Sequence, residues 1–149
     1  MLMRFLAALA LGALVGLERE FVGKEAGVRT LMLVSGGAAM FTLIALTVPY
    51  LMGNAFIASQ IISGGSGFLI IIANIVTGAG FLGAGIIIKT QEHVHGLTTA
   101  TMMWATAAIG ILVGLGQIQF AALASVIITV LLYVFRNFPF SREESRPRR

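Results

Sequence analysis

Residues 68–88 read FLIIIANIVTGAGFLGAGIII, an apolar run without one charged side chain. A helix that crosses a bilayer needs about 20 consecutive, mostly apolar residues, and this run has that length. The whole chain shares its character, because 58% of the 149 residues are hydrophobic and 11% are charged. Soluble domains carry about 25% charged residues. We therefore expect an all-α, polytopic integral membrane protein whose main surroundings are the lipid bilayer.

Similar runs recur along the chain and predict about five transmembrane helices, of which the glycine-rich run above is the third. The expected spans are residues 2–17, 30–52, 68–88, 97–115 and 120–135. Together they make residues 1–136 one transmembrane domain of the chain, followed by a basic cytoplasmic tail at residues 137–149.

The segment before the third span is harder to assign. A single helix over residues 55–88 would be about 51 Å long at 1.5 Å per residue, whereas the hydrocarbon core is about 30 Å thick. The sequence Gly64-Gly65-Ser66-Gly67 offers a break. We expect a short interfacial or re-entrant helix at 55–63, and one long tilted helix through 55–67 is the alternative.

The cations predict the orientation. Lys and Arg gather in residues 18–29, in residues 89–95 and after residue 135, whereas the linkers at 53–54 and 116–119 are uncharged. By the positive-inside rule, the N-terminus is outside and the C-terminus is cytoplasmic. Arg4 falls on the opposite side, where we expect it to snorkel to the surface. A basic tail beside a span indicates contact with anionic lipid, and we expect no nucleic-acid partner.

The glycines of the third span allow two structural interpretations. They are Gly78, Gly80, Gly83 and Gly85. Residues 78–83 spell the dinucleotide-binding pattern G-x-G-x-x-G, but that pattern requires a preceding strand and a later acidic residue, and here it lies inside a span. Small residues let membrane helices pack closely; alternatively, an unwound segment bares carbonyls to a polar cavity, as in some transporters. Asn74 shares a helical face with Gly78 and Gly85.

Polar residues at the span ends form a candidate functional cluster. Glu18 directly follows the first apolar run, and charges at such depth usually pair or line a cavity. We expect Glu18 to pair with Arg29 or with Arg19. The full cluster comprises Glu18, Arg19, Arg29, Thr30, Asn74, Thr77, Thr98 and Thr99. The threonines at the start of the fourth span would cap its helix, bond to another span or line a cavity.

Metal and catalytic chemistry have little support. The chain has no Asp, and Glu18 and Glu20 are weak candidate magnesium ligands because they lie among Arg and Lys. We expect at most a weak, hydrated Mg²⁺ site at the cytoplasmic mouth and no cofactor. His93 and His95 are too sparse for zinc. No Ser-His-acid pattern occurs, and we do not expect an enzyme.

Three ordered motifs resemble the MgtC/SapB family of membrane proteins. They are Gly16-Leu17-Glu18-Arg19-Glu20 with Ala26-Gly27-Val28-Arg29-Thr30, then Thr77 to Gly85, then Gly96-Leu97-Thr98-Thr99-Ala100 with Trp104. The resemblance implies a bacterial inner-membrane protein associated with growth at low magnesium and, in pathogens, with survival in host cells. It leaves two functions open: a regulator of membrane machinery such as ATP synthase or ion-transport ATPases, or a transporter of Mg²⁺ or another small ion. Small residues four positions apart, at Ala8, Gly12 and Gly16 and again at Gly110 and Gly114, make a homodimer a further expectation.

The chain departs from the family pattern in places. Members usually have an Arg shortly before the glycines of the third span, where this chain reads Ile70-Ile71-Ile72-Ala73-Asn74. His95 stands where Arg is common. Many members also carry a soluble C-terminal domain, and we expect a short basic tail in its place here.

Overall fold

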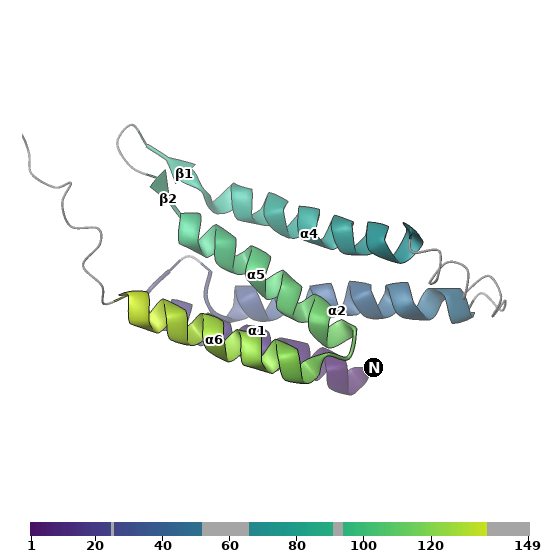
Figure 1. Ribbon diagram of the computed structural model, residues 1–149. Helices are drawn as coiled ribbons and strands as arrows, with labels where there is room; N and C mark the ends of the chain where they lie inside the picture. The colour runs from purple at the N-terminus through teal and green to yellow at the C-terminus, as the bar shows by residue number, and fades with distance from the viewer. Residues whose placement is uncertain (25, 52–65, 91–93, 137–149) are drawn as a thin grey trace, which may run out of the picture.

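The computed structural model describes residues 1–24, 26–51, 66–90 and 94–136, and these form a helical bundle with one small hairpin (Figure 1). The helices are α1 (Leu2–Phe21), α2 (Val28–Leu51), α4 (Ser66–Ile86), α5 (Leu97–Gly114) and α6 (Ile118–Arg136). The strands are β1 (Ile88–Lys89) and β2 (Val94–His95). The expected all-α membrane fold is confirmed.

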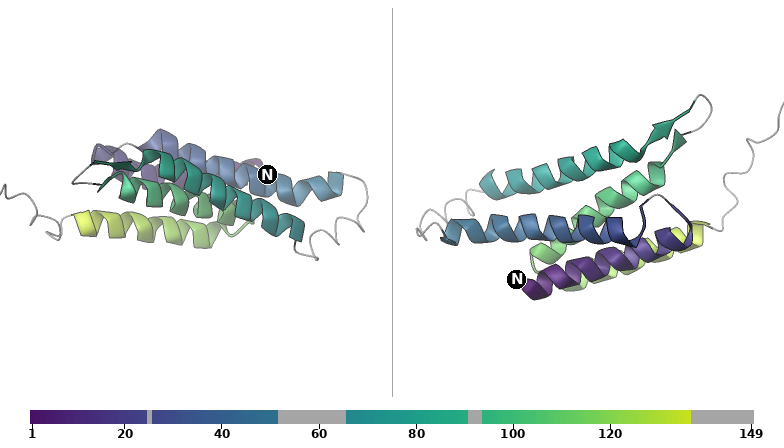
Figure 2. Two further views of the ribbon diagram at one scale, coloured as in Figure 1. Left: turned by 90° about the horizontal axis from the view of Figure 1, so that it is seen from above. Right: turned by 180° about the vertical axis from the view of Figure 1, so that it is seen from behind.

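Four of the described helices are long and apolar enough to cross a membrane: α2, α4, α5 and α6. Helix α1 has a comparable length of 20 residues, but its ends carry charge at Arg4 and at Glu18-Arg19-Glu20. It nevertheless runs alongside the others, packed against α2, α5 and α6 (Figure 2). The described residues thus form a multi-pass bundle in which α1 closes one side.

The helix ends gather at two opposite ends of the bundle. One end holds the last turn of α1, the first turn of α2, the β1–β2 hairpin, the start of α5 and the end of α6 (Figure 1). The N-terminus and the α5–α6 turn lie at the other end. Lys24, Arg29 and Lys89 therefore share one end, as the alternation of charged and uncharged linkers predicts.

The third span differs from its expected bounds. It begins at Ser66 and ends at Ile86 rather than reaching residue 88. Beyond it, Ile88 pairs with His95 and Lys89 with Val94 in an antiparallel hairpin that the sequence did not reveal. The expected helix at 55–63 and the tail at 137–149 lie outside the described residues.

Glycines allow α1, α2 and α5 to approach one another closely. A Cβ added to Gly12 of α1 would lie 2.6 Å from the carbonyl oxygen of Leu31 in α2. One added to Gly110 of α5 would collide with the carbonyl oxygen of Ser35, and one on Gly114 would lie 2.6 Å from the Cβ of Thr42. Real Cβ atoms do not approach other atoms so closely, so these positions require glycine. Backbone-to-backbone packing of this kind is how helices associate in lipid.

Helices α4 and α6 lie on opposite outer sides of this centre (Figure 1). The share of each span that is buried is 61% for α5 but only 11% for α4 and for α6. Helix α4 is uninterrupted through residues 77–85. Of the four glycines at 78–85 only Gly83 packs closely, where an added Cβ would lie 3.1 Å from the carbonyl oxygen of Ala100. Gly78, Gly80 and Gly85 would meet nothing within 4 Å.

Candidate functional site

Most of the candidate polar residues line one of two pockets. The first, called here the basic pocket, has a volume of about 800 Å³ and lies where α1, α5 and α6 meet the hairpin. Its walls are Arg19, Val22, Lys24, Val94, His95, Gly96, Leu97, Thr98, Thr99, Met102, Ile128, Leu131, Leu132 and Phe135. The second, called the Asn74 pocket, has a volume of about 560 Å³ and lies between α2, α4 and α5. It holds Arg29, Thr30, Asn74 and Gly78.

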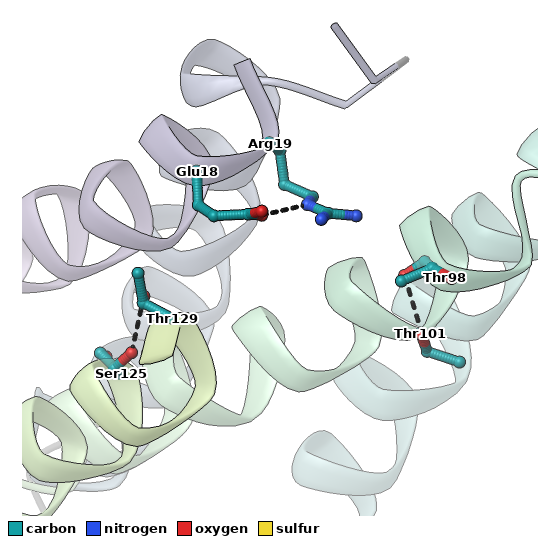
Figure 3. A network of polar contacts seen from close by, with 6 residues as sticks. All are labelled: Glu18, Arg19, Thr98, Thr101, Ser125 and Thr129. Atoms are coloured by element: carbon teal, nitrogen blue, oxygen red, sulfur yellow. Dashed lines mark hydrogen bonds and ion pairs between the residues drawn. The ribbon is translucent and has the colours of Figure 1, made fainter. Parts of the chain in front are cut away.

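A buried ion pair stands at the edge of the basic pocket. Nε of Arg19 donates to Oε2 of Glu18 at 2.6 Å, and each side chain is 6% exposed (Figure 3). Of the two pairings expected for Glu18, the structure shows the one with Arg19. The second oxygen, Oε1, is buried and has no hydrogen-bond partner within the described part of the chain. Removing one member of such a pair leaves an uncompensated buried charge, which typically costs about 3–5 kcal/mol.

The guanidinium of Arg19 points toward the first turn of α5, where Thr98 lies (Figure 3). That helix begins at Gly96, whose φ of +81° is left-handed and whose added Cβ would collide with the carbonyl oxygen of Ile86. The cap residue is therefore glycine, which has no side chain to cap the helix. The hydroxyl of Thr101 donates to the carbonyl oxygen of Thr98 at 2.8 Å. Thr99 is buried, and both Thr98 and Thr99 line the pocket.

Glu20 has a structural task that the sequence analysis missed. Its Oε2 accepts a hydrogen bond of 2.9 Å from the backbone N–H of Val28, the first residue of α2. The carboxylate thus satisfies one of the N–H groups left open at a helix start, where negative charge is also favoured. With Glu18 paired and Glu20 engaged in this way, both weak magnesium candidates already have partners. The described residues contain no group of three or more His, Cys, Asp or Glu able to hold a metal ion.

The Asn74 pocket brings together the cluster members from α2 and α4. Arg29 and Thr30 come from the first turn of α2, whereas Asn74 and Gly78 lie one turn apart on α4. The remaining walls are mostly apolar and include Phe41 and Leu82 from the facing helices, as well as Met103 and Ala107 of α5.

Thr77 joins neither pocket. Its hydroxyl donates to the carbonyl oxygen of Ala73 at 2.9 Å, and the residue is exposed.

Arg4 is a second polar residue whose role the sequence did not reveal. Its Nη1 donates to the carbonyl oxygen of Gly114 at 3.0 Å, and the bond is partly buried. This carbonyl lies in the last turn of α5, where intrahelical donors are lacking and a cation is favoured. Rather than snorkelling away, Arg4 fastens the start of α1 to the end of α5. The available signal was an isolated cation within a span that is otherwise uncharged up to Glu18.

Comparison with known proteins agrees with the motifs. A profile of the MgtC family matches residues 5–139. Protein MgtC of Salmonella typhimurium (strain LT2) is 42% identical over 128 residues, which are 85% of this chain and 48% of that protein. Protein MgtC of Brucella abortus (strain 2308) is 42% identical over 129 residues, or 87% of this chain and 48% of that protein.

The chain spans about half the length of these curated relatives. No solved structure matches it. The profile match nevertheless covers every described helix, including both pockets and the Glu18–Arg19 pair. On this basis, and with its expected motifs in place, the chain belongs to the MgtC family of membrane proteins.

Proposed function

We propose that this protein is a regulator of other membrane machinery in the bacterial inner membrane and that it supports adaptation to low magnesium. Its partner is an ATPase or transporter. The protein regulates this partner by contacts between membrane helices and not by catalysing a reaction. In a pathogen the same role would serve survival in host cells. The resemblance of the motifs supplies the physiological setting, and the outer surface of α4 supplies the mode of action.

The observation that carries this proposal is the open small-residue rim of the Asn74 pocket. Gly37 of α2 and Gly78 of α4 both line this pocket, and a Cβ added to either would meet nothing within 4 Å. In the centre of the bundle, by contrast, neighbouring helices occupy the space where a glycine side chain would stand. Small residues together with a polar amide are the usual means by which membrane helices associate. A helix from a partner fits this pocket, with Asn74 offering it a hydrogen bond.

A second copy of the chain is one such partner, which would make the protein a homodimer. The chain contains no cysteine, so a single Gly78→Cys substitution would report this directly by oxidative cross-linking in membranes. Cross-linking to itself supports the homodimer, whereas cross-linking only to another membrane protein supports a separate partner.

The second candidate function is transport of Mg²⁺ or another small ion. It is favoured by the oxygen atoms of Thr30 and Asn74, which lie in one pocket and suit a hard cation. Arg29 lines the same pocket and would repel a divalent cation at its mouth. We therefore place transport second.

The test uses complementation of a deletion strain at low magnesium. Gly78→Leu should abolish growth while leaving the amount and thermal stability of the protein unchanged, because a Cβ added at Gly78 meets nothing within 4 Å and the pocket beside it has a volume of about 560 Å³. Ala84→Leu is the matched control, since Ala84 is an exposed small residue of α4 six positions later, on another side of the helix. Growth of the Gly78→Leu strain equal to wild type would overturn the proposed contact.

Purified protein in liposomes separates the two functions. The regulator proposal expects no protein-dependent magnesium flux. Flux that depends on the protein and is lost in Asn74→Leu would replace it with the transporter.

The proposed orientation puts the basic pocket and the tail at 137–149 in the cytoplasm and the N-terminus outside. The support is the shared end of Lys24, Arg29 and Lys89. Reporter fusions after residue 116 and at the C-terminus should be active outside and inside, respectively. The opposite pair of results would reverse the orientation.

A further inference from the structure

We propose that the basic pocket binds an anionic phospholipid, with the phosphodiester at Arg19 and the start of α5 and an acyl chain along α6. This site is separate from the helix-contact surface of the Asn74 pocket, and the inference does not rest on the regulatory function. Four features of the pocket carry it.

The first feature is the guanidinium of Arg19, which lines the pocket. Arg19 has five N–H groups in a planar fork, and Nε makes its only side-chain hydrogen bond in the part of the chain that the structure describes. The residue is 5% exposed and lines the pocket. Because Arg19 lines the pocket, its guanidinium fork is placed to meet an anion there, and such a fork fits phosphate oxygens with two parallel bonds. An oxyanion in the pocket would accept from these groups.

The second feature is the positive end of α5. The first turn of this 18-residue helix lines the pocket through Gly96, Leu97 and Thr98. A helix start attracts an anion through its open N–H groups and its dipole. Figure 3 shows that the guanidinium of Arg19 points to this turn, so the two anion-binding elements face the same space.

The third feature is the charge of the site. Lys24 lines the pocket and is exposed, and its backbone N–H donates to the carbonyl oxygen of Arg19 at 3.1 Å, which holds the turn against α1. No carboxylate occurs among the described residues that line the pocket. Glu18 lies beside it and offsets the charge of Arg19, so among the described lining residues Lys24 adds a positive charge that no described carboxylate in the lining offsets. This positive charge attracts the negatively charged phosphodiester of a phospholipid.

The fourth feature is the apolar wall opposite the cations. Met102 of α5 and Ile128, Leu131, Leu132 and Phe135 of α6 form it. Leu131 is 49% exposed and Phe135 is 64% exposed. A soluble anion would leave this wall uncovered, whereas a phospholipid covers it with an acyl chain while its phosphate reaches Arg19. The joined basic and apolar walls therefore favour a lipid as the occupant.

The experiment measures lipid retention and thermal stability of the full chain in nanodiscs of phosphatidylcholine with increasing phosphatidylglycerol. We expect phosphatidylglycerol to be enriched around the wild-type protein and to raise its Tm by several degrees. Lys24→Gln should weaken the apparent affinity about fivefold, since one basic residue near an anionic surface contributes about 1 kcal/mol. Lys24 is exposed, so this variant keeps the fold. The double variant Glu18→Gln/Arg19→Gln, which leaves no unpaired buried charge, should lose the enrichment.

Two further variants test the location. Arg29→Gln is the matched control, because Arg29 is an exposed cation at the same end that lines the other pocket; it should bind phosphatidylglycerol like wild type. Leu131→Trp places a larger side chain on the apolar wall and so narrows the pocket. Since Leu131 is partly exposed, the fold should tolerate the change, and lipid enrichment should fall.

Three outcomes would overturn the proposal. The first is equal stability in phosphatidylcholine with and without phosphatidylglycerol. The second is an equal loss in Arg29→Gln and Lys24→Gln, which would indicate general surface charge. The third is an equal rise of Tm with millimolar inorganic phosphate in phosphatidylcholine alone, which would assign the pocket to a free anion.

Discussion

The glycines of α1 and α5 and the glycines of α4 behave in opposite ways. Gly12 and Gly110 face the same residue of α2, Ser35, from two sides, and neither has room for a methyl group. Gly78 and Gly85 on α4 have free space where a side chain would stand. Glycine thus allows close helix packing in the centre of the bundle, whereas on the outer helix α4 it leaves an uncovered surface. The difference lies in whether the facing helix belongs to the same chain.

This contrast makes the two sets separable by mutation. Substitutions at the centre should act on stability, because they displace backbone atoms of α2. Substitutions on the outer face of α4 should act on association and leave the isolated protein unchanged. The following four predictions test that division.

Gly110→Leu should have the largest effect. The side chain would be forced against the carbonyl oxygen of Ser35 and the Cβ of Ala38, which lies 2.9 Å from the site of an added Cβ. Overpacking against backbone that cannot yield costs about 3 kcal/mol or more. Unfolding in detergent, followed by circular dichroism, should show this loss. Wild-type stability would mean that α2 and α5 are not held as closely as described.

Gly12→Ala should cause the second-largest loss of stability. The added methyl group would lie 2.6 Å from the carbonyl oxygen of Leu31 and 2.7 Å from the Cβ of Ser35. We expect a loss of about 2 kcal/mol, smaller than for leucine because α1 can shift outward. The same unfolding assay measures it, and Ala13→Gly in the adjacent position provides a control for glycine content. A neutral Gly12→Ala would contradict the close approach of α1 to α2.

Arg4→Met should lower the free energy of unfolding by less than either glycine substitution. It removes the hydrogen bond to the carbonyl oxygen of Gly114 but keeps a long, flexible side chain and leaves no buried charge. Bonds to charged groups contribute about 1.5 kcal/mol to stability. We expect a lower Tm and faster hydrogen exchange in the last turn of α5. Unchanged exchange there would show that Arg4 does not fasten that turn.

Gly78→Ala should have the smallest effect, within about 0.5 kcal/mol of wild type, because the methyl group meets nothing within 4 Å. The same change at Gly83 is its control, since that methyl group would press on the backbone of Ala100. If Gly78→Ala lowered stability as much as Gly83→Ala, the outer face of α4 would be covered by the chain itself.

The sequence predicts the fold class well because a helix that crosses a bilayer requires a long run of uncharged residues. Such runs can be recognised without knowing which residues are in contact. It also predicts that Glu18 is paired, since an acidic residue directly after an apolar run needs a partner. The choice of Arg19 over Arg29 depends on which way the last turn of α1 faces, and that orientation is set by packing. The β1–β2 hairpin is not predictable from pattern, because strands of two residues have no periodicity.

The glycine patterns show the same limit. Four glycines in nine residues predict close packing most strongly at 77–85, yet only Gly83 there meets another helix closely. The sparser pairs in α1 and α5 form the packed centre. Small residues allow another helix to approach closely. Which helix does so depends on how all the helices are arranged. For the same reason most of the polar residues, which the sequence offers as one cluster, line one of two pockets.

The hydrogen bond from Arg4 to Gly114 also bears on how the protein is made. Its two residues are 110 positions apart, and ribosomes add about 5 to 20 residues per second. Arg4 is therefore synthesised about 5 to 20 s before its acceptor at Gly114. During that interval the arginine must be accommodated by water, lipid headgroups or the insertion machinery. Helix α1 is thus fastened by a helix synthesised later, and a chain truncated before Gly114 would carry Arg4 without this hydrogen bond.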